Sequence, residues 1–228
     1  MPELSARLKM AADEVTPGSV IADIGTDHAY LPVYLLKLGI IKKALACDIS
    51  KGPLCNAEKT SRFFNVEDKI EMRLSDGFDG ISPDEADEFV ICGMGGSLIA
   101  ELIERTPWLK NSRYRLIIQP QSHSVDVRNC LIGSGFEIQS EKACFDSGRV
   151  YNLMVASYTG VKKEYPAYYP WFGSLIDRDD EACRETVKRT LGHLKRRQSA
   201  QQKTGNKAEA DELGEIIRQA EEKINENR

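Results

Sequence analysis

The sequence of 228 residues lacks several features that assign chains to other classes of protein. No apolar run approaches the roughly 20 residues that a membrane-spanning helix requires. The six cysteines include no CxxC pair, which argues against a zinc site or a disulfide framework and is typical of a reducing compartment. The N-terminal segment MPELSARLKMAADEV alternates charged and apolar residues, unlike a signal peptide. We therefore expect a cytoplasmic protein without a metal site or a membrane partner.

A strong charge of either sign is also lacking. The formal net charge is −4, which does not by itself indicate a nucleic-acid partner. Global charge is nevertheless a poor guide for enzymes that bind through one local patch. With 41% hydrophobic and 29% charged residues, the composition is that of a globular protein. The length fits one α/β domain of ordinary size with a small appendage.

Short apolar stretches that favour strands alternate with amphipathic stretches that favour helices. We expect strands at residues 20–24, 43–49, 70–74, 88–92 and 115–119, and helices at residues 4–15, 29–38, 53–64, 97–105 and 124–132. Two further strands, 136–144 and 150–158, follow each other without a spacer of helix length, which predicts an antiparallel pair. The fold class is therefore α/β, a Rossmann-like sheet with a terminal antiparallel strand.

The composition changes after Tyr158. Residues 164–173 (EYPAYYPWFG) are aromatic and proline-rich, which favours a packed linker. Beyond it, two runs of apolar residues step by threes, fours and sevens, and Thr204-Gly205-Asn206 separates them. This pattern predicts a coiled-coil-like helical hairpin. We therefore expect two domains, residues 1–160 and 161–228.

The strongest local motif is IADIGTDHAYLP, residues 21–32. A strand that ends in Asp23-Ile24-Gly25 and opens onto a helix lets the backbone approach a nucleoside closely, because glycine has no side chain to intrude. Only the first glycine of a GxGxxG-like pattern is present, and Asp27 and Ala29 occupy the later positions. A carboxylate at Asp27 fits a ligand that carries an ammonium group rather than a pyrophosphate. An ordinary turn is the alternative interpretation.

Two further carboxylates follow predicted strands. Asp48 lies 23 positions after Gly25, where an acidic residue commonly accepts hydrogen bonds from a ribose diol. Asp76, in Ser75-Asp76-Gly77, follows the third strand, where an adenine amino group would need an acceptor. Each alone is equally compatible with a helix cap or a turn. Together with Asp23 they favour a nucleoside site at the carboxyl edge of the sheet.

The fourth strand leads into Ile91-Cys92-Gly93-Met94-Gly95-Gly96. It lacks the acidic or amide residue that often grips the target amine in amino methyltransferases. One interpretation is a flexible turn before a helix. The other is that bare backbone groups line the gap between a methyl donor and an acceptor base. Nothing indicates a nucleophilic role for Cys92, and Gln119-Pro120-Gln121 is either a source of an amide contact or a plain strand end.

These segments resemble the bacterial tRNA (adenine-N1)-methyltransferases that modify adenosine at position 22. The matching segments are Arg7-Leu8, DIGTDHAYLP, Asp48-Ile49-Ser50, Gly52-Pro53-Leu54, ICGMGG and IIQPQ. The resemblance spans residues 4–158 closely. It implies a class I methyltransferase fold, S-adenosylmethionine as donor with S-adenosylhomocysteine as product, and transfer to N1 of adenosine 22 in tRNA. It also implies that the C-terminal hairpin helps to hold tRNA.

The resemblance and the motifs together define a predicted donor site and a predicted catalytic group. Adenine N1 carries an in-plane lone pair, so transfer needs alignment and charge stabilisation rather than an obligatory base. Asp27 would orient the amino acid portion of the donor, and His28 would contact the acceptor unless it is simply a helix-start residue. The predicted catalytic residues are Asp27, His28, Gly93 and Met94. The predicted donor-binding residues are Asp23, Gly25, Asp27, His28, Asp48, Ile49, Asp76, Gly77, Gly93, Met94 and Gly95.

RNA contacts are predicted on the first helix of the hairpin. They are Lys188, Arg189, Lys195, Arg196 and Arg197, some of which share a face away from the apolar seam. A solvated charged face is the alternative. His123 and His193 show no partners in the sequence. Whether the hairpin dimerises is open, and we expect a monomer.

Other functions share parts of these patterns. A methyltransferase acting on another RNA, a protein or a small molecule would have the same donor site. A nicotinamide oxidoreductase usually has more glycine in the first loop and continues with a parallel strand. A non-catalytic nucleotide-binding adaptor would use the hairpin to engage a protein.

Overall fold

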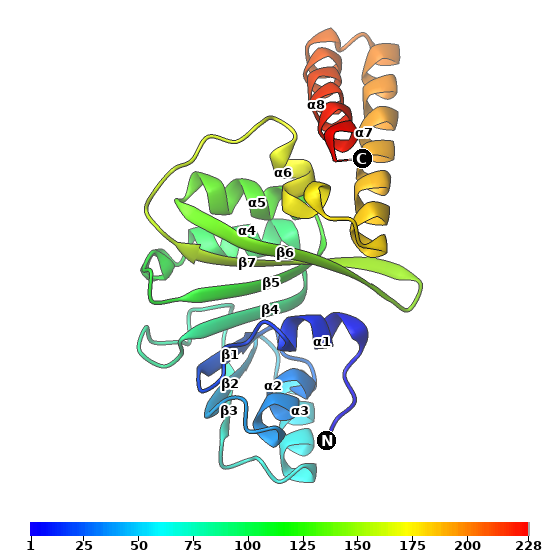
Figure 1. The fold of residues 1–228 in the computed structure, drawn as a ribbon. Helices are drawn as coiled ribbons and strands as arrows, with labels where there is room; N and C mark the ends of the chain where they lie inside the picture. Colours follow the sequence, from blue (N-terminus) through cyan, green and yellow to red (C-terminus); the bar gives the residue numbers. More distant parts are fainter. Residues whose placement is uncertain (228) are drawn as a thin grey trace.

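The first five strands are parallel and the last two form an antiparallel hairpin at one edge of the same sheet (Figure 1). The computed structural model describes residues 1–227. The strand order is β3-β2-β1-β4-β5-β7-β6, which confirms the predicted Rossmann-like sheet with a terminal antiparallel strand. The strands are β1 (Val20–Ile24), β2 (Lys43–Asp48), β3 (Ile70–Leu74), β4 (Glu88–Gly95), β5 (Arg115–Ser122), β6 (Phe136–Asp146) and β7 (Arg149–Tyr158).

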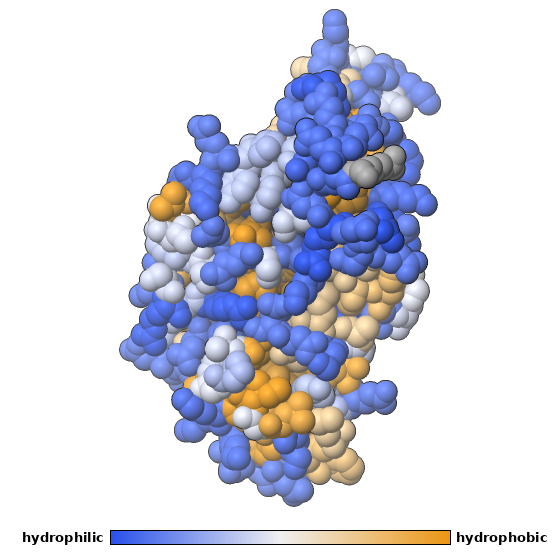
Figure 2. Space-filling view, in the orientation of Figure 1, coloured by the Kyte–Doolittle hydropathy of each residue, from blue (hydrophilic) through white to orange (hydrophobic). Residues whose placement is uncertain are grey.

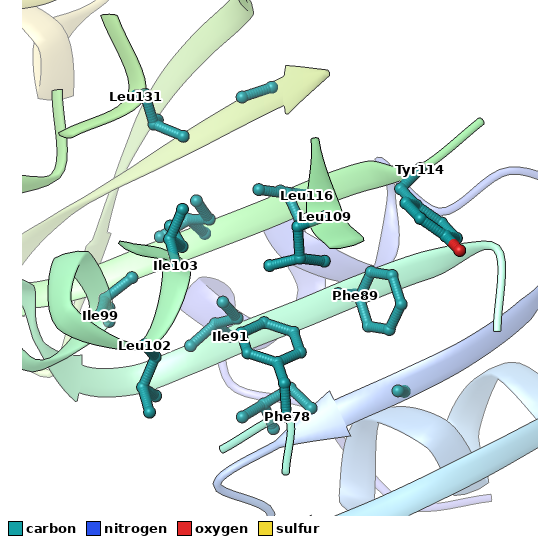
Figure 3. Close-up of a cluster of buried hydrophobic side chains, with 14 of the residues drawn as sticks. Phe78, Phe89, Ile91, Ile99, Leu102, Ile103, Leu109, Tyr114, Leu116 and Leu131 are labelled. Atoms are coloured by element: carbon teal, nitrogen blue, oxygen red, sulfur yellow. The ribbon is translucent and has the colours of Figure 1, made fainter. Parts of the chain in front are cut away.

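Helices cover both faces of the sheet, which explains why its central strands are apolar on both sides. The helices of the sheet domain are α1 (Ala6–Ala12), α2 (Tyr30–Lys37), α3 (Lys51–Phe63), α4 (Gly96–Glu104) and α5 (Ser124–Gly133), with a 3₁₀ turn η1 (Pro107–Leu109). One apolar core lies under α1, α2 and α3, and the other lies under α4 and α5. In the second core Phe89 makes edge-to-face contacts with Phe78 and Tyr114, each at 5.5 Å between ring centroids (Figure 3).

Strands β4 and β5 run further than the sequence predicts. Met94 and Gly95 remain paired with Pro120 and Ser122 of β5 instead of forming a turn. The pairing shifts register on both sides of Met94, and Gly93 adopts a φ of +87°. A bulge of this kind accommodates an extra residue and re-aims the chain at the end of a strand. The GMGG segment is therefore a shaped strand end rather than a flexible turn.

The C-terminal hairpin consists of α7 (Glu181–Thr204) and α8 (Lys207–Glu226). Gly205 ends α7 in a left-handed conformation, as glycine commonly does after a helix. The seam between the helices buries apolar residues including Leu194, Leu213 and Ile217. The outer surface of the hairpin is mainly hydrophilic (Figure 2). The helical hairpin predicted from the apolar spacing is thus present, and it projects beyond the sheet (Figure 1).

The aromatic linker folds into two short turns, α6 (Tyr169–Phe172) and η2 (Gly173–Asp177). A buried ion pair holds them to the sheet domain. Arg128 of α5 donates from Nε to Glu141 Oε1 of β6 at 2.8 Å, and both side chains are almost inaccessible to solvent. The same guanidinium donates to the carbonyls of Pro170 and Trp171 at 3.1 and 3.2 Å.

Glu141 completes this junction from the other side. The backbone N–H of Ser174 donates to its Oε2 at 2.6 Å. Gly173 has a φ of +57°, and any Cβ there would overlap the Glu141 carboxylate. Since each charged group has several partners inside the protein, the pair fixes where the linker leaves the sheet.

We predict that Glu141→Ala lowers the free energy of unfolding by about 3–5 kcal/mol, because it leaves the Arg128 charge buried without a counter-charge. Urea denaturation of the full chain measures this loss. The control is Glu58→Ala, which breaks an exposed i,i+4 pair with Arg62 and should cost no more than about 0.5 kcal/mol. The double variant Arg128→Met with Glu141→Leu should lose less than Glu141→Ala. Equal losses in Glu58→Ala and Glu141→Ala would contradict the assignment.

Candidate functional site

The carboxyl ends of β1 and β4 come into direct contact at Gly25. Its φ is +78°, and a Cβ there would lie only 2.9 Å from Met94 Sδ. Glycine is therefore needed both for the backbone conformation and for the approach of the methionine. The contact unites the DIG and GMGG motifs, which are distant in sequence, into one surface at the edge where open α/β sheets bind ligands.

Asp23 supplies a buried carboxyl group next to this surface. Its residue is 8% exposed. Burial raises the pKa of the Asp23 carboxyl to about 6, and the nearby Asp48 carboxylate adds to the increase. A carboxyl group with a pKa raised in this way is a candidate for function when it lies at a ligand-binding edge.

Two buried polar atoms at the same edge have no hydrogen-bond partner within residues 1–227. They are Thr26 Oγ1, in the loop after β1 and near enough to Asp23 to lower the pKa of its carboxyl, and Gln119 Nε2, within β5. Buried polar groups are almost always satisfied, so such atoms need an explanation. A polar ligand at the strand ends would provide one.

The Asp27-His28 pair lies in the loop before α2. His28 Nε2 is 3.4 Å from Asp27 Oδ2, and the ring stacks on Tyr30 with centroids 5.1 Å apart. The Asp27 side chain is 72% exposed and the His28 side chain 39%. The pair is therefore open to an incoming molecule, in contrast to the buried Asp23.

The ends of β2 and β3 carry the other predicted donor residues. Asp48 Oδ1 accepts from the Ser50 N–H at 2.7 Å, and the neighbouring Ile49 exposes an apolar side chain. Asp76 accepts from Arg105 Nη2 at 2.6 Å. A Cβ at Gly77 would overlap Leu102 of α4. Asp76 and Gly77 therefore have contacts that also hold α4 in place.

One contact at the site was not assigned from the sequence. Arg7 of α1 donates from Nη1 to Gln119 Oε1 at 3.0 Å, and a Cβ at Gly93 would lie 3.7 Å from the same nitrogen. Arg7 and Gln119 are 112 positions apart, so no local pattern joins them. The only feature of the sequence that pointed to these two residues is that both belong to segments that carry the family resemblance.

Cys92 is close to these groups but is not activated. Burial raises the pKa of its thiol well above the ordinary range, and the Asp23 carboxylate has the same effect. The thiolate is the nucleophilic form of cysteine. The structure thus agrees with the absence of a nucleophilic role.

The predicted RNA-binding residues are distributed around α7 rather than gathered in one patch. Arg189 and Arg197 line a groove between α7 and the sheet domain. Lys188 lines a different hollow with Arg184, although it also shares a third, shallower one with Arg189. Arg196 lies beside Ser199 and Lys203. The fifth residue, Lys195, pairs with Glu221 of α8 at 2.6 Å.

Within residues 1–227, no cluster of three or more His, Cys, Asp or Glu side chains is arranged to hold a metal ion. In the same part of the chain, no helix has the length and apolarity to cross a membrane.

Comparison with known proteins gives a consistent set of relatives. A family model described as a methyltransferase domain matches residues 4–154. The tRNA (adenine(22)-N(1))-methyltransferase of Bacillus subtilis (strain 168) is 36% identical over 154 residues, which cover 68% of this chain and 65% of that protein. The matched region thus spans slightly less than two thirds of that relative.

Two solved structures extend the likeness to the whole chain. The crystal structure of the B. subtilis M1A22 tRNA methyltransferase TrmK has a TM-score of 0.87 at 28% identity and covers 97% of this chain and 99% of that one. Streptococcus pneumoniae Sp1610, a putative tRNA (m1A22) methyltransferase in complex with S-adenosyl-L-methionine, has a TM-score of 0.81 at 28% identity. That match covers 94% of this chain and 100% of the other.

We predict that Asp23 makes stability fall as pH rises from about 4 to about 7. Its pKa is 3.8 ordinarily and about 6 in the fold, so the folded state favours the protonated carboxyl. The stabilisation is complete below pH 3.8 and is lost through pH 6, by about 3 kcal/mol in total.

Urea denaturation of wild type and Asp23→Asn across this pH range isolates the effect, because the other carboxyl groups are common to both. The difference in unfolding free energy should shift in favour of the variant as pH rises. The control Asp84→Asn alters a side chain that is 87% exposed and should show no such trend. A constant difference between wild type and Asp23→Asn would refute the prediction.

Proposed function

Because this chain belongs to the methyltransferase-domain family whose model matches residues 4–154, we propose that it transfers a methyl group from S-adenosylmethionine to N1 of adenosine 22 in tRNA. The observation that carries the proposal is the surface made by Gly25 and Met94 beside the buried Asp23. The named activity of the B. subtilis relatives supports the choice of substrate. The S-adenosylmethionine held by the S. pneumoniae relative supports the choice of donor.

The residues at the strand ends fit the proposed donor. Gly25 brings the end of β1 against Met94 of β4, and Asp48 and the exposed Ile49 offer a carboxylate and an apolar surface. The hydroxyl of Thr26 is buried beside them. In our proposal Asp23 and Asp27 attract the ammonium group of the donor. Asp48 accepts from the ribose, and the end of β3 with Asp76 and Gly77 borders the adenine. When bound, S-adenosylmethionine supplies an electrophilic methyl group on a sulfonium.

The catalytic role proposed for the protein is alignment. Adenine N1 attacks with its own lone pair, so no side chain has to remove a proton before transfer. The backbone of Gly93, Met94 and Gly95 borders the reacting atoms and leaves room for a flat base. The exposed His28 contacts the acceptor, and the Asp27 carboxylate beside it offsets the positive charge that develops on the ring.

The two parts of the chain have separate tasks in this proposal. Residues 1–160 bind the donor and perform the transfer, while residues 161–228 contribute contacts to tRNA. We propose that the protein acts in the cytoplasm, where its tRNA substrate is found, and as a monomer. The hairpin seam is already filled by its own two helices.

We predict that the full chain, incubated with methyl-labelled S-adenosylmethionine and an unmodified tRNA transcript that has adenosine at position 22, produces 1-methyladenosine. Nucleoside analysis by chromatography and mass spectrometry identifies the product. The matched control is the same transcript with guanosine at position 22, which should receive no label. Label in a different nucleoside, or none in tRNA, would refute the proposal.

We also predict that Asp27→Ala weakens S-adenosylmethionine binding at least about tenfold, because one charged contact to the donor contributes at least about 1.5 kcal/mol. Isothermal titration calorimetry measures the affinity. Asp84→Ala removes another exposed carboxylate, which pairs with Arg113, and this variant should bind the donor as wild type does. Unchanged affinity in Asp27→Ala would remove Asp27 from the donor site.

A further inference from the structure

A groove of about 760 Å³ separates α7 from the end of β5 and the start of α5. One wall is the face of α7 that carries Arg189, His193 and Arg197. The other wall begins at Gln121 and continues through the start of α5, and Trp171 of α6 also lines the groove. The buried Arg128–Glu141 pair fixes the position of this wall relative to the hairpin, because Arg128 binds the Trp171 carbonyl.

The groove is continuous with the proposed acceptor edge. A Cβ at Gly93 would lie 3.5 Å from Gln121 Nε2, and one at Gly95 would lie 3.7 Å from Ser122 Oγ. Gln121 and Ser122 also line the groove. A polymer with one base at Gly93 to Gly95 therefore has its neighbouring units directed along this groove.

The side chains of the groove suit a polyanion. Its α7 wall presents two guanidinium groups, two threonine hydroxyls and an imidazole, and His123 lies on the opposite wall. Among the lining residues of the described chain, the only acidic one is Asp126, and its carboxylate accepts from Ser97 Oγ at 2.6 Å. The lining residues themselves thus carry two guanidinium groups against one carboxylate, on a chain whose net charge is −4.

Both arginines have partners that a phosphate group can replace. Arg189 pairs with Glu185 at 2.6 Å, and Arg197 pairs with Glu209 at 2.6 Å while lying over the Trp171 ring. These pairs are exposed, and exposed ion pairs contribute little to stability. A phosphodiester accepts a guanidinium in the same bidentate geometry as a carboxylate.

We propose that this groove binds the RNA backbone next to the target adenosine, with Arg189 and Arg197 on two different phosphates. The two residues are eight positions apart, about 12 Å along the helix axis, a spacing that suits two phosphates of one strand. This inference rests on the proposed function. It narrows the RNA contact from the whole basic run of α7 to the face that carries Arg189 and Arg197.

Adjacent residues provide matched controls. Lys188 precedes Arg189 and Arg196 precedes Arg197, but neither control residue lines the groove. We compare Arg189→Gln with Lys188→Gln, and Arg197→Gln with Arg196→Gln. Within each pair, both variants remove one positive charge from adjacent positions of the same helix. A general electrostatic attraction would therefore affect both members equally.

The probe is an unmodified tRNA transcript with adenosine at position 22, and binding is measured by filter retention at several salt concentrations. Arg189→Gln and Arg197→Gln should each raise the Kd at least about tenfold and reduce the salt slope by about one. Lys188→Gln and Arg196→Gln should change the Kd about twofold or less. In methyl transfer, the groove variants should raise KM with little change in kcat, because phosphate contacts are the same before and during transfer.

Glu209→Gln separates RNA binding from the stability of the hairpin. It breaks the same ion pair as Arg197→Gln but leaves the arginine in the groove, so its tRNA affinity should equal or exceed that of wild type. If wild type methylates the transcript, two results would overturn the assignment of the groove to RNA. One is an equal loss of affinity in the groove variants and their controls, and the other is wild-type affinity in both arginine variants. Failure of wild type to methylate it would overturn the proposed function, and the groove with it.

Discussion

The buried ion pair between Arg128 and Glu141 is the constraint on which the placement of the C-terminal hairpin against the sheet depends. Charges removed from water destabilise a protein unless each is paired and hydrogen-bonded. Here the guanidinium reaches the carbonyls of Pro170 and Trp171, and the carboxylate accepts from Ser174 N–H. Because both charges need these partners, the linker residues 170–174 are held against α5 and β6. The direction in which α7 emerges follows from that placement.

The donor edge depends on a different constraint, the close approach of two backbones. At Gly25 the absence of a side chain allows Met94 to pack directly on the loop. Around the bulge, Met94 and Gly95 stay paired with β5 instead of being free. Such a site is shaped before any ligand arrives, which suits a reaction whose acceleration comes mainly from alignment. The buried Asp23 and the exposed Asp27 offer carboxylates in two different environments at this edge.

In the proposed function, recognition of RNA depends on a local distribution of charge that the net charge of the chain does not reveal. The hairpin carries many acidic residues, and several basic side chains of α7 are paired with them. The basic residues of α7 therefore lie on different faces of the helix. One face meets the sheet domain and forms a groove, while the others meet solvent or α8. A protein with a net negative charge can bind a polyanion in this way.

The order of the elements and most of their bounds could be predicted from the sequence, because apolar periodicity and glycine turns are local signals. The sequence also placed Asp23, Asp48 and Asp76 at successive strand ends, since parallel strands bring their carboxyl ends to one edge. It did not reveal the extension of β4, since a bulge depends on the partner strand. Contacts such as Arg7 with Gln119 and Arg128 with Glu141 join residues from different elements, and no spacing rule relates them.

Which basic residues of α7 face the groove likewise could not be predicted without the tertiary structure. Helical spacing shows which residues share a face, but not which face another domain covers. The covered face depends on where the linker packs against the sheet. A buried ion pair between α5 and β6 fixes that position. Local sequence thus determined the elements and the chemistry at their ends. Which of these side chains come into contact depends on the tertiary structure, because burial and charge compensation act between segments that are distant along the chain.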